Sequence, residues 1–150
     1  MNLDSFKVAR FPEECKTLAQ RGAGYVYVFC VFSHNGEVPF YVGQTRRLRD
    51  RMGDYESRSF YACTDFIVGT AAEYFRQLGL QVLIRYTESE TPRLMERALI
   101  RDLVVDGWRL LNGLPKYDYS DKRNTKESES TVVKAFCDML VHRRTKAASL

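Results

Sequence analysis

Apolar residues are densest in residues 24–52, where two hydrophobic runs flank a short polar break. Aromatic and β-branched residues dominate positions 25–32 and 37–42, and the break between them ends in an Asn-Gly pair. This arrangement predicts a β-hairpin, because glycine tolerates the positive φ that the reversal needs. Beyond the second run the apolar positions Leu48 and Met52 fall four apart, which predicts that a helix follows the second strand.

Weaker patterns predict the elements on either side of the hairpin. Residues 1–23 are interpreted as a helical lead-in. Residues 70–78 predict a helix, and residues 80–86 predict a third strand that pairs beside the hairpin. Residues 54–68 are aromatic and have no regular period, so we expect a loop there that lies over the functional site.

The most strongly marked helix covers residues 91–106. Thr91 is a favourable N-cap and Pro92 suits the first helical position, while a glycine follows the last turn. Residues 116–130 are polar and have no apolar period. After them, apolar residues recur at the spacing of an amphipathic helix, which we expect to dock on the same domain.

Together these elements predict a single α/β (α+β) domain with a small three-stranded antiparallel sheet flanked by helices. We divide the chain into the lead-in at 1–23, a central domain at 24–113, and a polar linker with a C-terminal amphipathic helix at 114–150. A chain of 150 residues with 45% hydrophobic content is sufficient for one core of this kind.

Composition narrows the function only slightly. The chain has 23 basic and 19 acidic residues, and the net charge of +4 permits a polyanionic partner without requiring one. Its 4 cysteines are widely spaced and only 2 histidines are present, so we expect buried free thiols and no zinc site. The N-terminus lacks a signal-peptide core and no run of about eighteen apolar residues occurs, so we expect a soluble cytoplasmic protein with no membrane partner.

Six residues with reactive or anchoring side chains follow one another in a characteristic order. Tyr27 ends a Tyr-Val-Tyr triplet, and Tyr41 opens a Tyr-Val-Gly triplet. Arg51 lies ten positions after Tyr41, and Tyr55 lies four positions after Arg51. A glutamate in the helix over 91–106 and an asparagine in a Leu-Leu-Asn-Gly turn complete the set, which is Tyr27, Tyr41, Arg51, Tyr55, Glu96 and Asn112. The set resembles the signature of the GIY-YIG nuclease family, with Tyr-Val-Tyr in place of the usual Gly-Ile-Tyr. The resemblance implies a GIY-YIG-like fold and a catalytic role for all six residues.

The activity that the resemblance implies is metal-dependent hydrolysis of DNA phosphodiester bonds. In this hypothesis Glu96 binds a Mg²⁺ or Mn²⁺ ion, and Arg51 clamps the scissile phosphate. Tyr27 or Tyr41 acts as the general base, and the sequence leaves that choice open. A free tyrosine has a pKa near 10, so ionising it at pH 7 costs roughly 4 kcal/mol, which a nearby cation and Arg51 would have to offset.

Basic residues beside Arg51 are candidates for contacts with the DNA backbone. The candidate nucleic-acid-binding set is Gln44, Arg46, Arg47 and Arg49, with Gln44 where several members of the family carry a lysine. Three further arginines lie four apart on the helix over 91–106 and are interpreted as a solvated face. No base-reading module is recognisable, so a DNA-recognition partner protein or self-association is expected in addition to DNA.

A non-catalytic module is the alternative. Singly, each site residue has an ordinary explanation: tyrosines on strands are mostly packing residues, and an asparagine before a glycine is typical of a turn. A nucleic-acid-binding or scaffold protein that keeps the fold would bind DNA with ordinary salt dependence and would not cut it. Only the complete ordered set favours the nuclease.

Overall fold

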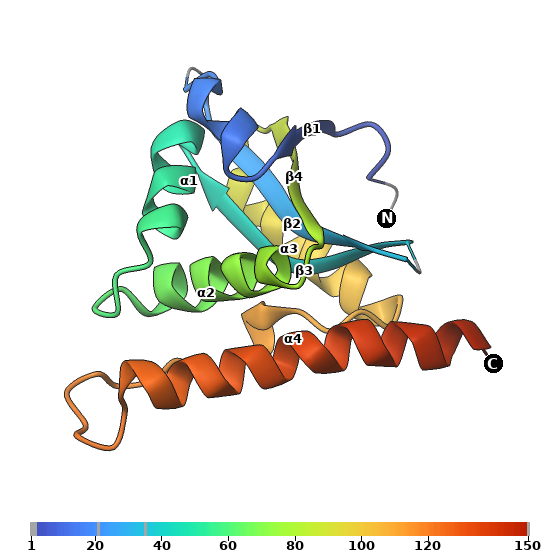
Figure 1. The fold of residues 1–150 in the computed structure, drawn as a ribbon. Coiled ribbons are helices and arrows are strands. Elements are labelled where there is room, and N and C mark those ends of the chain that lie inside the picture. Colours follow the sequence, from blue (N-terminus) through green and yellow to red (C-terminus); the bar gives the residue numbers. More distant parts are fainter. Residues whose placement is uncertain (1–2, 21, 35, 150) are drawn as a thin grey trace.

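The computed structural model describes residues 3–20, 22–34 and 36–149, with the side chains of residues 143–149 excluded (Figure 1). A four-stranded antiparallel sheet of order β1-β4-β2-β3 forms its centre. The strands are β1 (Lys7–Arg10), β2 (Tyr25–Ser33), β3 (Gly36–Thr45) and β4 (Gln81–Glu88). The α+β class is therefore confirmed, whereas the predicted count of three strands is wrong.

The additional strand lies in the segment that was predicted to be a helical lead-in. β1 pairs with β4 from Lys7 opposite Tyr86 to Arg10 opposite Leu83, so it forms one edge of the sheet. Among the described residues of this segment, the helical part is the 3₁₀ helix η1 (Glu13–Thr17). A four-residue strand is too short to produce a recognisable alternation, and its pairing with β4 is a tertiary contact that the local sequence does not specify.

The hairpin of β2 and β3 follows the predicted pattern. Gly36 has a φ of +111°, as the reversal requires; Asn35, part of the predicted turn, lies outside the described residues. Tyr27 lies opposite Gly43 and Phe29 opposite Tyr41, before a bulge shifts the register. These pairings put Tyr27 and Tyr41 on the same face of the sheet.

The sheet is buried on both faces. On one face Tyr27, Phe29 and Val31 pack with residues of α1 (Leu48–Ser57), α2 (Cys63–Gln77) and α4 (Lys126–Ser149). On the other, Val26 and Val28 pack with α3 (Pro92–Val105), which lies behind the sheet in Figure 1. Burial on both faces explains why β2 is a continuous hydrophobic run.

The predicted loop at 54–68 is wrong. α1 continues to Ser57 and α2 begins at Cys63, which leaves a connection of residues 58–62. Residues 66–72 of α2 are buried one after another, so this part of the helix has no polar face to mark it in the sequence. The predicted helix at 70–78 covers the second half of α2 and is confirmed. Gly69 permits the close crossing, because a Cβ there would collide with the carbonyl oxygen of Tyr55 in α1.

The remaining helices follow the sequence more closely. α3 begins at Pro92 and its C-cap is Asp106, within a residue of the predicted helix at 91–106. α4 carries Val133, Cys137 and Leu140 into the core beside α2. Within the described part of the chain, no helix combines the length and the apolar character needed to cross a membrane.

Candidate active site

Three tyrosine rings pack together where β2, β3 and α1 meet. We call Tyr27, Tyr41 and Tyr55 the phenol cluster. The hydroxyls of Tyr27 and Tyr55 are 2.5 Å apart, and the ring centroids of Tyr41 and Tyr55 are 6.1 Å apart. Tyr27 is 1% exposed and Tyr55 0%, whereas Tyr41 is partly exposed. Tyr41 is therefore the member of the cluster that solvent or a substrate can reach.

A glycine makes room for the cluster. Gly43 lies opposite Tyr27 across the hairpin, and a Cβ at that position would overlap the phenol ring and hydroxyl of Tyr27. The Tyr-Val-Gly triplet thus has a packing reason for its glycine: the ring of one strand lies over the backbone of the next.

The glycine requirement gives a stability prediction. Replacing Gly43 by alanine is expected to lower the free energy of unfolding by about 1–3 kcal/mol, because the methyl group would force the Tyr27 ring out of its position. Gly53, in the middle of α1, is the matched control, since no described atom would crowd a Cβ there. Gly53→Ala should stabilise the protein by about 0.5–1 kcal/mol. Denaturant unfolding of both variants would measure the change in the free energy of unfolding. Equal changes in Gly43→Ala and Gly53→Ala would contradict a packing role for Gly43.

Burial keeps the phenols neutral. It raises the pKa of Tyr27, Tyr41 and Tyr55 above the usual value, and hydrogen bonding to Tyr55 raises the pKa of Tyr41 further. The charge of Arg51 acts in the opposite direction on all three pKa values. A positive charge beside the cluster is therefore what would make a phenolate accessible.

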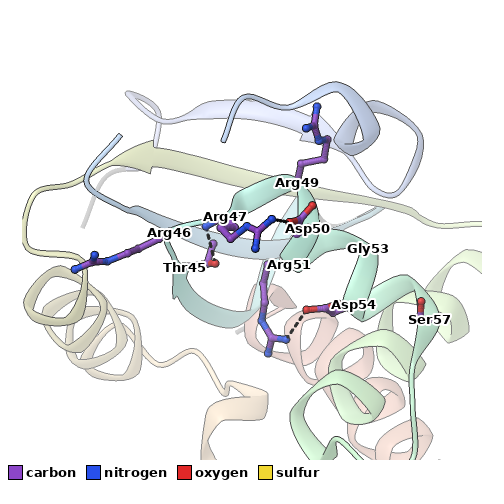
Figure 2. Close-up of a pocket in the computed structure, with 9 residues that line it drawn as sticks. All are labelled: Thr45, Arg46, Arg47, Arg49, Asp50, Arg51, Gly53, Asp54 and Ser57. Carbon is purple, nitrogen blue, oxygen red and sulfur yellow. Dashed lines mark hydrogen bonds and ion pairs between the residues drawn. The ribbon is translucent and has the colours of Figure 1, made fainter. Parts of the chain in front are cut away.

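Arg51 extends from α1 beside the phenol cluster. Its guanidinium carbon lies 4.4 Å from the centroid of the Tyr55 ring. Nη1 is bound by carboxylates: Asp65 at 2.6 Å and Asp54 at 3.4 Å, the second pair being drawn in Figure 2. Burial alone would lower the pKa of Arg51, but Tyr55, Tyr27 and Asp65 raise it, so the guanidinium is always charged.

Asp65 is the site residue that the sequence did not reveal. It lies in the first turn of α2, inside the stretch that was expected to be a loop, and it is 16% exposed. Its ion pair uses Nη1 of Arg51 and leaves the other guanidinium edge for the phenols or a phosphate. An acidic residue in the first turn of a helix is a recognisable signal, but only once the helix itself has been located.

Glu96 lies in α3, on the face of the sheet opposite the phenol cluster. Its half-buried carboxylate forms no hydrogen bond or ion pair with any residue that the structure describes. Burial raises the pKa of this carboxyl, partly offset by Arg97 and Arg93, and the charge of Glu96 in turn raises the pKa of Tyr41.

One carboxylate, that of Glu96, is the candidate ligand for a metal ion. No three or more His, Cys, Asp or Glu side chains among the described residues are grouped to hold an ion. A half-buried carboxylate without a protein partner does fit a hard divalent cation that takes its other oxygens from phosphate and water. The residues present are thus compatible with Mg²⁺ or Mn²⁺ held by Glu96 together with substrate.

Asn112 holds the edge of the sheet. Its Oδ1 accepts a hydrogen bond from the Val42 amide at 2.9 Å, and its Nδ2 donates one to the Val42 carbonyl at 2.8 Å. The side chain thereby pairs with β3 as a strand would, one residue from Tyr41. Its described hydrogen bonds are to the backbone and not to the phenol cluster, which makes Asn112 a positioning residue for Tyr41.

The arginines that follow β3 diverge. Arg47 pairs with Asp50 at 2.7 Å. Figure 2 shows Arg46 extending toward α3, whereas Arg49 points away from Arg51 on the opposite side of α1. Of the predicted nucleic-acid-binding residues, Arg46 and Gln44 share a groove with Arg51. The other two do not line that groove.

Comparisons with known proteins add no assignment. No family model, curated protein or solved structure matches this chain. The evidence for a function therefore comes from the positions and contacts of the described site residues.

Proposed function

We propose that this protein is a metal-dependent endonuclease, similar to the GIY-YIG nucleases, that hydrolyses DNA phosphodiester bonds. The observation that carries the proposal is the half-buried carboxylate of Glu96, which has no described hydrogen-bond or ion-pair partner and acts on the reachable phenol, Tyr41. A packing glutamate would be expected to have an ion-pair or hydrogen-bond partner, because leaving a partly buried charge unpaired is costly.

Arg51 would hold the scissile phosphate. Its guanidinium is fixed by the Tyr55 ring and by Asp65, so its orientation is set before substrate arrives. A planar guanidinium can offer two parallel N–H groups to phosphate oxygens. This preorganised charge also favours the negative charge that grows on the phosphate during attack.

Tyr41 is the better of the two candidate bases. The water proton would pass to the Oη of an ionised Tyr41 as the water oxygen bonds to phosphorus and the bond from phosphorus to the leaving sugar oxygen breaks. Tyr27 is too deeply buried to meet that water, and its hydroxyl lies 2.5 Å from the hydroxyl of Tyr55. A bound Mg²⁺ or Mn²⁺ ion would supply charge stabilisation at the phosphate and favour the phenolate.

Nicking of supercoiled plasmid tests the proposal. Wild-type protein should convert the plasmid to the open-circular form with Mg²⁺ or Mn²⁺ and should be inactive with a chelator. The rate should rise with pH through the neutral range, by about tenfold per unit, because the pKa of Tyr41 lies above its usual value and its ionised fraction grows as protons are removed. A rate that is flat or falls over this range would contradict a phenolate base.

A non-catalytic DNA-binding module is the second candidate. One observation favours it: the carboxylates of Asp65 and Asp54 already occupy Nη1 of Arg51. This alternative predicts salt-dependent binding of DNA with no strand scission under any divalent ion.

A further inference from the structure

A groove opens next to the phenol cluster, between the end of β3 and the start of α3. Its volume is about 830 Å³. Residues from three elements line it, among them Gln44, Arg46, Arg51, Thr91 and Arg93. One end of the groove therefore meets Arg51, and α3 forms the opposite wall.

No carboxylate lines this groove, although three arginines do. The neighbouring groove over α1, drawn in Figure 2, has acidic residues in its wall: Asp50 pairs with Arg47, and Asp54 with Arg51. Arg46 and Arg93 thus give the first groove positive charge that no carboxylate in its wall offsets, whereas two of the four arginines that line the second groove are ion-paired with Asp50 and Asp54.

Two of its arginines are available to a ligand. No hydrogen bond or ion pair joins the Arg46 or Arg93 guanidinium to any side chain in the described part of the chain, and both residues are exposed. Arg93 lowers the pKa of Glu96, so its charge acts on the candidate metal ligand. The groove therefore has Arg51 at one end, and Arg93 in its opposite wall lies about one turn before Glu96 along α3.

We propose that this groove binds the DNA strand being cut, and that Arg46 and Arg93 hold the phosphate next to the scissile one. The assignment rests on the proposed function for the position of the scissile phosphate. Arginine forks suit phosphate oxygens, and a wall without carboxylates avoids repulsion of the strand. Arg93 also supplies, from a different element, the positive charge that Gln44 does not carry.

This assignment separates the arginines into two groups. Arg46 and Arg93 each neutralise one phosphate charge, whereas Arg101, about two turns further along α3, does not line the groove. The observed affinity for DNA falls with salt by a slope of about 0.9 per neutralised phosphate on a log–log plot. Each groove arginine should therefore contribute about 0.9 to that slope.

Fluorescence anisotropy with a short labelled DNA duplex, over a salt series in the presence of chelator, measures the slope without cleavage. Arg46→Gln and Arg93→Gln are each expected to reduce the slope by about 0.9, and the double variant by about 1.8. Arg101→Gln, which removes the same charge from the same helix as Arg93, should keep the wild-type slope. Wild-type slopes for Arg46→Gln and Arg93→Gln, or an equal reduction in Arg101→Gln, would overturn the assignment.

Plasmid nicking by the wild-type protein is measured separately, so the two proposals can fail independently. Reduced slopes in the two groove variants without any nicking would support the groove and contradict the nuclease. Nicking with unchanged slopes would contradict the groove alone.

Discussion

Replacing Glu96 by glutamine is expected to reduce metal-dependent nicking at least about a thousandfold, equivalent to roughly 4 kcal/mol of transition-state stabilisation. The reason is that the proposed metal ligand Glu96 is a half-buried carboxylate with no hydrogen-bond or ion-pair partner among the described residues, and a neutral amide binds divalent ions poorly. Rates from plasmid nicking at saturating Mg²⁺, for wild type and variant prepared in parallel, give the ratio directly.

The same substitution should leave the fold intact. Burial raises the pKa of Glu96, which means that the folded protein disfavours the charged form of this carboxyl. A neutral amide removes that cost, so Glu96→Gln should unfold at the same temperature as wild type or higher. Glu90→Gln, at an exposed position just before α3, is the control and should keep wild-type nicking. Equal activity in the Glu96 and Glu90 variants would mean that the metal assignment is wrong and that any cleavage comes from a contaminant.

Tyr41→Phe is expected to lower the nicking rate at least about a hundredfold, as loss of a general base does. Tyr41 is the phenol of the cluster that is not fully buried, and it is the one whose pKa responds to Glu96. Phenylalanine keeps the ring that packs on Tyr55 and Phe29, so the effect should be on the rate and not on stability. Single-turnover nicking over a range of pH would show the pH dependence lost together with the rate.

Tyr27→Phe is the matched comparison. Its hydroxyl is buried against Tyr55 at 2.5 Å, so removing it should cost about 1 kcal/mol of unfolding free energy and reduce the rate less than Tyr41→Phe does. A larger rate loss in Tyr27→Phe, with less than a threefold loss in Tyr41→Phe, would mean that Tyr27 and not Tyr41 is the general base. Small losses in both would remove the phenols from the mechanism.

Local signals were sufficient where a feature depends on neighbouring residues. The Asn-Gly pair and the apolar runs predicted the hairpin, and the Thr91-Pro92 start predicted α3 to within a residue. The turn alone would place Tyr27 opposite Val42; the bulge at Phe29 and Cys30 shifts the register, so that Tyr27 lies opposite Gly43 and on the same face as Tyr41. The two strands could therefore be predicted from the sequence, whereas the register that brings the two tyrosines together could not.

Features that depend on packing between distant segments were missed. β1 is four residues long and exists as a strand because β4 pairs with it. The first half of α2 was missed because residues 66–72 are buried one after another, although its second half lies in the predicted helix at 70–78. The contact of Asp65 with Arg51 depends on the close crossing of α1 and α2 at Gly69. Asn112 showed its turn signal in the sequence, but its two bonds to Val42 join residues 70 apart.

The central claim is that Glu96, Arg51 and Tyr41 surround one position for a phosphate and a divalent ion. Paramagnetic line broadening by Mn²⁺ tests it most directly, recorded by NMR on the protein bound to a non-cleavable DNA duplex. We expect signals of Tyr41, Arg51 and the α3 residues around Glu96 to broaden first, and the broadening to disappear in Glu96→Gln. Broadening centred elsewhere, or unchanged in Glu96→Gln, would contradict the claim.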